Sequence, residues 1–158
     1  MPLEIERKFL VAGVAWREGA VAERLVQGYL VALPDLSIRV RRTGDRCAIT
    51  IKGGRAGLVR SEYEYDIPVV DGEELLRSLC GARVIEKVRH RLSFAGRTWT
   101  VDEFLGVHAG LLLAEVELTR PDEIIELPPW LGLEVTGDPA YQNATLSRGA
   151  AGSDGERT

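Results

Sequence analysis

Charged and apolar residues alternate with a period of two along most of this chain, and this pattern constrains its fold more than any other feature. The first example is Glu4-Ile5-Glu6-Arg7-Lys8. In an extended strand the first, third and fifth of these side chains share one face. Two glutamates there can hold one small cation, and the lysine beside them suits a phosphate oxygen. Alone, the pentapeptide would equally fit an exposed edge strand of mixed charge.

The charged faces of the later strand-like segments are sorted by sign. Basic pairs such as Arg39 and Arg41 alternate along the chain with acidic pairs such as Glu62 and Glu64. A sheet with one solvated face would also alternate apolar and polar residues, which is the alternative interpretation. A surface selected for solubility, however, would mix the two signs within each strand. About eight antiparallel strands can close around one small ligand. We therefore expect a mainly β (α+β) fold, a closed eight-stranded antiparallel barrel with a few flanking helices.

The expected elements follow from the local pattern. Strands are predicted for residues 4–8, 26–31, 37–42, 47–52, 60–67, 83–92, 98–102 and 111–119, with a short one at 134–136. Helices are predicted for residues 14–25, for 71–80 with Asp71 as the N-cap, for 119–126, and from Asp138-Pro139 to about residue 147. We expect one domain over residues 1–148 and a disordered tail over 149–158.

Composition narrows the possible functions. The formal net charge is −4 over 158 residues, which argues against a general nucleic-acid binder. The two cysteines have no metal-site spacing, and no apolar run is long enough for a signal or a membrane span. We therefore expect a cytoplasmic protein that contacts neither nucleic acid nor membrane.

Lysine is used sparingly. Seventeen of the twenty basic residues are arginine, and the lysines are Lys8, Lys52 and Lys87. A compact ammonium group differs from a planar guanidinium in hydration and in how it donates hydrogen bonds. The three positions are therefore candidates for a role that arginine cannot take.

The ordered set of motifs resembles the CYTH superfamily, the triphosphate tunnel metalloenzymes, and within it the short bacterial inorganic triphosphatases. The first pentapeptide resembles that family's ExExK motif. The similarity continues in family order through Ser37-Ile38-Arg39-Val40-Arg41, Thr50-Ile51-Lys52, Glu62-Tyr63-Glu64, Glu86-Lys87-Val88-Arg89, Asp102 and Glu115-Val116-Glu117. It covers nearly the whole chain.

The resemblance implies a role for each matching residue. Metal ligands would be Glu4, Glu6 and Glu117, with Glu115 and Asp102 near the same end. Phosphates would be bound by Lys8, Arg39, Arg41, Lys52, Lys87 and Arg89. Glu62 and Glu64 would support these basic groups. As a hypothesis for catalysis, Tyr29 acts as an auxiliary base and Lys87 favours its phenolate form; the alternative is a structural tyrosine that hydrogen-bonds within the barrel.

The function that we expect is hydrolysis of inorganic tripolyphosphate to pyrophosphate and phosphate, with Mg²⁺ or Mn²⁺ as cofactor. The chain has no evident insert for recognising a base, which favours a substrate without an organic part. Other family members cyclise ATP or hydrolyse thiamine triphosphate, and these activities stay open. A polyphosphate-binding module without catalysis is the alternative of a different class. A homodimer is also left open.

Overall fold

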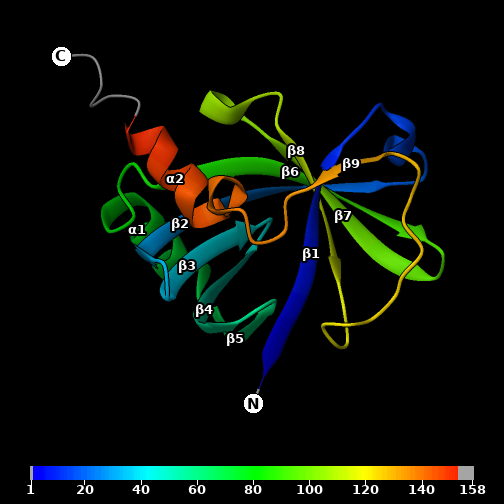
Figure 1. Cartoon of the computed structure of the whole chain (residues 1–158). Coiled ribbons are helices and arrows are strands. Elements are labelled where there is room, and N and C mark those ends of the chain that lie inside the picture. Colours follow the sequence, from blue (N-terminus) through cyan, green and yellow to red (C-terminus); the bar gives the residue numbers. More distant parts are fainter. Residues whose placement is uncertain (1, 153–158) are drawn as a thin grey trace.

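The computed structural model describes residues 2–152, with the side chains of residues 55, 56 and 148–152 outside that description. Nine strands form a single antiparallel sheet in the order β5-β4-β3-β2-β6-β7-β8-β1-β9 (Figure 1). They are β1 (Leu3–Val11), β2 (Val21–Leu33), β3 (Leu36–Thr43), β4 (Arg46–Ala56), β5 (Val59–Ile67), β6 (Val84–Phe94), β7 (Arg97–Phe104), β8 (Leu112–Glu117) and β9 (Leu131–Glu134).

The two edges of β1 close the sheet. One edge pairs with β8 from Glu6 to Leu10. The other edge pairs with β5 from Leu3 to Ile5, and beyond that with β9. Eight strands therefore form a closed barrel and β9 extends the sheet outside it. The prediction of a closed eight-stranded antiparallel barrel is confirmed.

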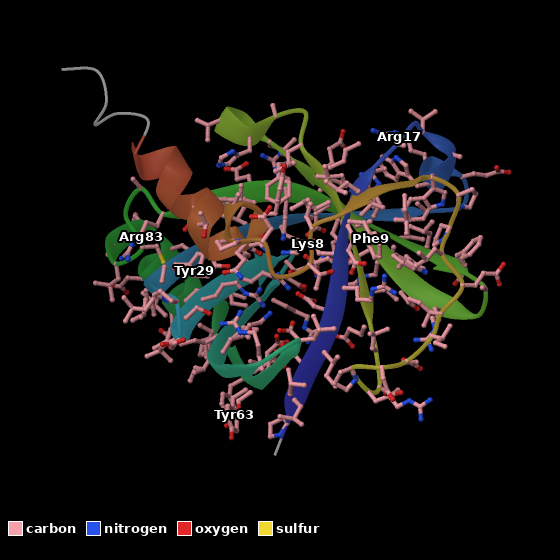
Figure 2. The ribbon with its side chains drawn as sticks, viewed as in Figure 1. Lys8, Phe9, Arg17, Tyr29, Tyr63 and Arg83 are labelled. Carbon is pink, nitrogen blue, oxygen red and sulfur yellow. The ribbon has the colours of Figure 1, made fainter. Side chains whose placement is uncertain are left out.

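The main hydrophobic core lies on the outer face of the barrel. Phe9 and Trp99 project outward from β1 and β7, and their ring centroids are 5.9 Å apart. Trp130 packs edge-on against Trp99, and Trp16, from the short helix η1 (Ala15–Arg17), completes the cluster. Figure 2 shows Lys8 and Phe9, neighbours in sequence, on opposite sides of β1. Burying the apolar face outside leaves the inward face free for polar residues.

At one end of the barrel the inward faces change from charged to apolar. Phe104 follows Asp102 by two residues, whereas Ile85 and Leu113 precede Lys87 and Glu115 by two. These three apolar residues pack against Val135 and Leu146. Leu146 belongs to α2 (Asn143–Gly152), the orange-red helix that lies across this end in Figure 1. We call these five residues the apolar plug. It seals one end of the charged lumen.

Two glycines allow α1 (Val69–Ser78) to approach the strands closely. A Cβ atom on Gly72 would lie 2.5 Å from Sγ of Cys47. A Cβ atom on Gly28, in β2, would lie 2.8 Å from Sγ of Cys80. Both cysteines are buried free thiols that pack at these contacts.

The predicted helix over residues 14–25 is wrong. Only Ala15–Arg17 form a 3-10 turn, and β2 begins at Val21. Gly19 has a φ of +72°, which ends helical geometry. The following residues pair in register with β6, opposite positions 87–91. Pairing with a distant strand overrides the local amphipathic pattern.

Other boundaries also differ. The predicted helix over residues 119–126 is a turn, in which the Glu123 carboxylate accepts hydrogen bonds from Thr119 and Arg97. Pro68 stands at the N-cap of α1, so Asp71 lies inside its first turn and not at the cap. Asp138 does act as a cap, but for the 3-10 helix η3 (Pro139–Tyr141).

The C-terminal helix and the last strand are shifted from their predicted bounds. The strand expected at 134–136 is β9, which ends at Glu134. α2 starts at Asn143 and continues to Gly152, into the segment expected to be disordered; the rest of that predicted tail, residues 153–158, lies outside the described residues. In the described part of the chain, none of the helices is long and apolar enough to cross a membrane.

Candidate active site

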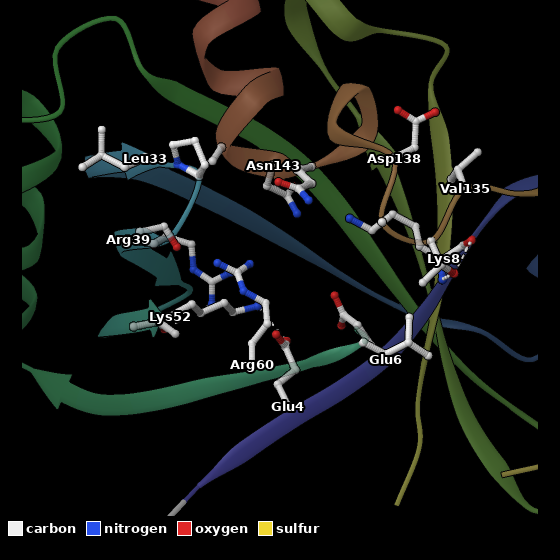
Figure 3. A pocket seen from close by; sticks show the side chains of 18 of the residues that line it. Glu4, Glu6, Lys8, Leu33, Arg39, Lys52, Arg60, Val135, Asp138 and Asn143 are labelled. Carbon is white, nitrogen blue, oxygen red and sulfur yellow. Dashed lines mark hydrogen bonds and ion pairs between the residues drawn. The ribbon is translucent and has the colours of Figure 1, made fainter. Parts of the chain in front are cut away.

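The lumen contains two connected cavities that share Glu4, Glu6, Arg39, Lys52 and Asn143. The wide cavity, about 540 Å³, is also lined by Glu62, Glu64 and Glu117, and its size is typical of a small-ligand site. The narrow cavity is also lined by Pro34, Gly57 and Asp138. Figure 3 shows Glu4 and Glu6 projecting from β1 into this space, opposite Arg39 and Lys52.

The structure brings the residues predicted from the sequence into this lumen. Those that line one or both cavities are Glu4, Glu6, Lys8, Tyr29, Arg39, Arg41, Lys52, Glu62, Glu64, Arg89, Glu115 and Glu117. Lys87 and Asp102 are more deeply buried and contact residues of that set. The inward direction of the charged faces is therefore correct; the chemical role of each residue stays a prediction.

Two residues of β1, Glu4 and Lys8, each form an ion pair with a residue of another strand. Nζ of Lys52 lies 2.6 Å from Oε1 of Glu4 and 3.7 Å from Oε2 of Glu62. Burial is the largest single effect on Glu4 and opposes its ionisation, but the charge and hydrogen bond of Lys52, with a hydrogen bond to Glu62, together outweigh it and lower the pKa of that carboxyl group. Nζ of Lys8 lies 3.4 Å from Oε1 of Glu115 and donates to the carbonyl oxygen of Tyr141 at 3.0 Å.

Burial and this lysine act in opposite directions on Glu115 as well. Burial, the largest single effect, would raise the pKa of its carboxyl group, but the attractions of Lys8, Arg89 and Lys87 together outweigh it and the pKa falls to about 2. Glu115 therefore stays ionised at neutral pH. It is held in the lumen as a permanent negative charge.

Asp102 accepts hydrogen bonds from two cations. Nε and one terminal nitrogen of Arg89 donate to its two oxygens at 2.8 and 2.9 Å, and Nζ of Lys87 lies 2.7 Å away. Burial would raise the pKa of Asp102, but the two cations hold it well below its usual range. Burial lowers the pKa of Lys87 to about 7 against the attraction of Asp102. Nζ of Lys87 also donates to Oδ1 of Asn143 at 3.1 Å.

Glu6 is a partly buried carboxyl group that lacks such compensation. Burial, then the negative charges of Glu115 and Glu4, raise its pKa to about 8. In the β1–β8 ladder it stands opposite Glu117. A cation placed among these carboxylates would remove their mutual repulsion.

The two lumen-lining arginines of β3 are held differently. A terminal nitrogen of Arg39 donates to Oγ1 of Thr50 at 3.1 Å and lies 4.0 Å from Glu64. Thr50 in turn donates to Glu64 at 3.0 Å. Arg41 donates twice to the side-chain oxygen of Gln27, at 3.1 and 2.9 Å. Burial, with the like charges of Arg39 and Arg89, lowers the pKa of Arg41 to about 9.

Tyr29 is buried, with 4% of its surface exposed, and lines the narrow cavity. Its electrostatic neighbours include Lys8 and Arg41. In the β2–β6 ladder Lys87 stands opposite Leu25, four residues along β2 from Tyr29. Lys8 and Arg41 therefore interact electrostatically with Tyr29, whereas Lys87 pairs with a different position of β2.

Sequence reasoning missed three residues that hold the cations, namely Gln27, Thr50 and Asn143. Gln27 and Thr50 share the inward faces of β2 and β4, so the same period of two could have identified them. Asn143 begins α2, and only the tertiary fold brings it to Lys87. The prediction concentrated on ionisable residues and overlooked the neutral ones.

The carboxylates fit a hard divalent cation, which takes oxygen ligands. Glu6 supplies a reason for one, because its pKa rises beside Glu4 and Glu115. Within residues 2–152, as far as their side chains are described, no three acidic, histidine or cysteine groups form a cage by themselves. Mg²⁺ commonly uses only one or two carboxylates and completes its shell with water and phosphate oxygens. The donor set is therefore suited to an ion that arrives with a phosphate substrate.

A closed antiparallel barrel with a lumen of paired lysines, arginines and carboxylates defines the class of this protein. The chain belongs to the CYTH domain family, whose model matches residues 2–148. It is 47% identical over 146 residues to an inorganic triphosphatase of Acetivibrio thermocellus, covering 92% of this chain and 94% of that protein. It is 40% identical over 149 residues to an inorganic triphosphatase of Nitrosomonas europaea, covering 91% and 96%.

A solved structure agrees with these sequence comparisons. The crystal structure of an inorganic triphosphatase is 36% identical to this chain and superimposes with a TM-score of 0.68. The match covers 93% of this chain and 95% of that one. The resemblance inferred from the motifs is confirmed at the level of the family and the fold.

Proposed function

We propose that this protein hydrolyses inorganic tripolyphosphate to pyrophosphate and phosphate. The observation that carries the proposal is the lumen itself, where cations and carboxylates line one cavity of about 540 Å³. Such a space suits a compact polyanion accompanied by a metal ion. The relatives named inorganic triphosphatase support the same substrate.

The basic residues would hold the phosphate chain. Lys8, Lys52 and Arg39 line the same cavity as Glu4 and Glu6, so they are placed to take phosphate oxygens near the carboxylates. Arg89 and Arg41 border the wide cavity, through which we propose that substrate enters. Charge-assisted hydrogen bonds to phosphate are shorter and stronger than neutral ones, which makes these residues the main source of affinity.

The metal ligands would be Glu4, Glu6 and Glu117, with Mg²⁺ or Mn²⁺ as the ion. When bound, the ion supplies positive charge that offsets the negative charge of the phosphates. Glu115 is held by Lys8, and we propose that it supports this end of the site. Asp102 is engaged by Arg89 and Lys87, so we propose that it orients those cations more than it binds metal.

In the proposed reaction, a water oxygen bonds to the terminal phosphorus, and the bond from that phosphorus to its bridging oxygen breaks. The bridging oxygen leaves with pyrophosphate, and the water gives up a proton. Tyr29 lines the narrow cavity, and in the proposed reaction its phenolate form would accept that proton. Glu62 and Glu64 would steady Lys52 and Arg39.

The experiment that tests this function offers tripolyphosphate, ATP and thiamine triphosphate in turn, with Mg²⁺ or Mn²⁺. We expect tripolyphosphate to release one phosphate and one pyrophosphate at the highest rate. Cyclic AMP from ATP would assign a cyclase instead, and faster turnover of thiamine triphosphate would assign that substrate. Tight binding of tripolyphosphate without turnover would leave only a polyphosphate-binding module.

We further propose a cytoplasmic location, which suits two free thiols.

A further inference from the structure

The cations of the lumen differ in what holds them. Lys8, Lys52, Lys87, Arg39 and Arg89 each have a carboxylate oxygen within 4.0 Å. In the part of the chain whose side chains are described, no such carboxylate lies within that distance of Arg41. Its recorded partner is the neutral amide of Gln27.

The backbone places Gln27 under Arg41. The two residues stand opposite each other in the β2–β3 ladder, so their side chains leave the sheet on the same side. Gln27 is completely buried, at 0% exposure, whereas Arg41 reaches the wide cavity. The amide therefore lies behind the guanidinium group as seen from the cavity.

The orientation of the amide follows from the chemistry of its partner. A guanidinium group can only donate hydrogen bonds, so the amide oxygen must face Arg41. Both Nε and a terminal nitrogen of Arg41 donate to that oxygen. This fork fixes the plane of the guanidinium group, and its positive charge is not cancelled.

A carboxylate at this position would seem the more stabilising choice. It would accept the same two hydrogen bonds and add a direct attraction for the arginine. The chain instead keeps an amide whose Nε2 atom is buried without a hydrogen-bond partner among the described residues. An unsatisfied buried donor reduces stability, so the amide is not explained by stability alone.

We propose that Gln27 is a positioning residue, which fixes Arg41 through a neutral acceptor so that the full charge of Arg41 faces the phosphate chain. This inference rests on the proposed function, because it assigns Arg41 to the same substrate. It adds a specific requirement, that the group behind Arg41 be uncharged.

The test compares Gln27→Glu with Gln27→Met, which removes the acceptor at similar volume. For Gln27→Glu we expect a thermal midpoint equal to or above the wild-type value, because the fork is kept and strengthened. Its KM for tripolyphosphate should rise about tenfold with kcat changed far less, because the added charge offsets that of Arg41. Gln27→Met should lower the thermal midpoint and raise KM less.

A double-mutant cycle shows whether Gln27 acts through Arg41. In an Arg41→Gln background, Gln27→Glu should raise KM by clearly less than it does alone, because the charge that it offsets is already gone. If Gln27→Glu instead leaves KM at the wild-type value, or raises it equally in both backgrounds, the positioning role is wrong.

Failure of the proposed function would be recognised separately, because the wild type would then release no phosphate. In that case calorimetric titration with tripolyphosphate compares the dissociation constants of wild type and Gln27→Glu. Equal affinity of wild type and Gln27→Glu would overturn the inference even if the protein is only a binder. An absence of tripolyphosphate binding by the wild type would overturn both.

Discussion

Asp102 and Arg89 face each other across the β6–β7 ladder and share two hydrogen bonds of 2.8 and 2.9 Å inside the barrel. The same carboxylate lies 2.7 Å from Nζ of Lys87, which is completely buried. One aspartate thus compensates two cations that would otherwise repel each other. The charged lumen depends on this cluster for its stability as well as for its proposed function.

Removing that negative charge should therefore destabilise the protein. We expect Asp102→Asn to lower the free energy of unfolding by about 3 kcal/mol or more, because Lys87 would remain buried with no counter-charge. Urea denaturation measures the change. Asp66→Asn is the matched control, since Asp66 and its partner Arg46 are both mostly exposed. Equal effects of the two substitutions would contradict the account of the cluster.

The three lysines should not be replaceable by arginine. Lys8, Lys52 and Lys87 all point into the lumen, each beside a carboxylate. We expect at least two of the three Lys→Arg variants to lose tenfold or more in turnover, about 1.4 kcal/mol of barrier. Steady-state kinetics with tripolyphosphate measures this. Full activity in all three would mean that the lumen needs only positive potential.

Arg7→Lys tests the outer face of the same strand. Arg7 donates to both oxygens of Glu134, at 2.9 and 2.6 Å, and ties β1 to β9. Turnover should stay near the wild-type value, while stability at neutral pH falls by at most about 1 kcal/mol, since the pair is partly exposed. A large loss of turnover would show that the two faces of β1 are not functionally distinct.

The stability difference at Arg7 should also depend on pH. The hydrogen bonds from Arg7 lower the pKa of Glu134 below its ordinary value of 4.5. A lowered pKa in the folded state gives stability that is present above the unfolded pKa and is lost as the pH falls through the folded one. Thermal midpoints of wild type and Arg7→Lys should therefore converge between pH 5 and strongly acidic pH, on the order of pH 2. A difference between the two thermal midpoints that grows as the pH falls would contradict this expectation.

Gly72→Ala should disturb the contact of α1 with the barrel. The new methyl group would lie 2.5 Å from Sγ and 2.7 Å from Cβ of Cys47, so the helix must shift. We expect a loss of about 1 to 3 kcal/mol in unfolding free energy, despite the better helix propensity of alanine. Glu74→Ala, at an exposed position of the same helix, is the control. A stabilised Gly72→Ala variant would show that the contact is not tight.

The period of two was enough to predict which side chains enter the lumen, because one face of each strand has to be apolar. Phe9 and Lys8 illustrate the two choices. Tertiary pairing could not be read in the same way. Residues 21–25 look amphipathic at helical spacing but pair with β6, and Asn143 reaches Lys87 only because α2 packs at the apolar plug.

The neutral residues of the site were missed for a different reason. The period of two places Gln27 on the inward face of its strand, but nothing in the sequence shows that it holds Arg41. Its importance follows from complete burial and from the two hydrogen bonds that it accepts from Arg41. Long-range geometry of this kind requires the folded structure.

The most direct test of the proposed function compares phosphate release by wild type and Glu6→Gln with tripolyphosphate and Mg²⁺ or Mn²⁺. Glu6 is partly buried and is influenced by the negative charges of Glu4 and Glu115, and neutralising it removes a proposed metal ligand while the basic residues remain. The account predicts rapid release by the wild type, none above background by the variant, and tripolyphosphate binding that largely survives in calorimetry. Full activity of Glu6→Gln at limiting metal, or no release by the wild type with either ion, would contradict it.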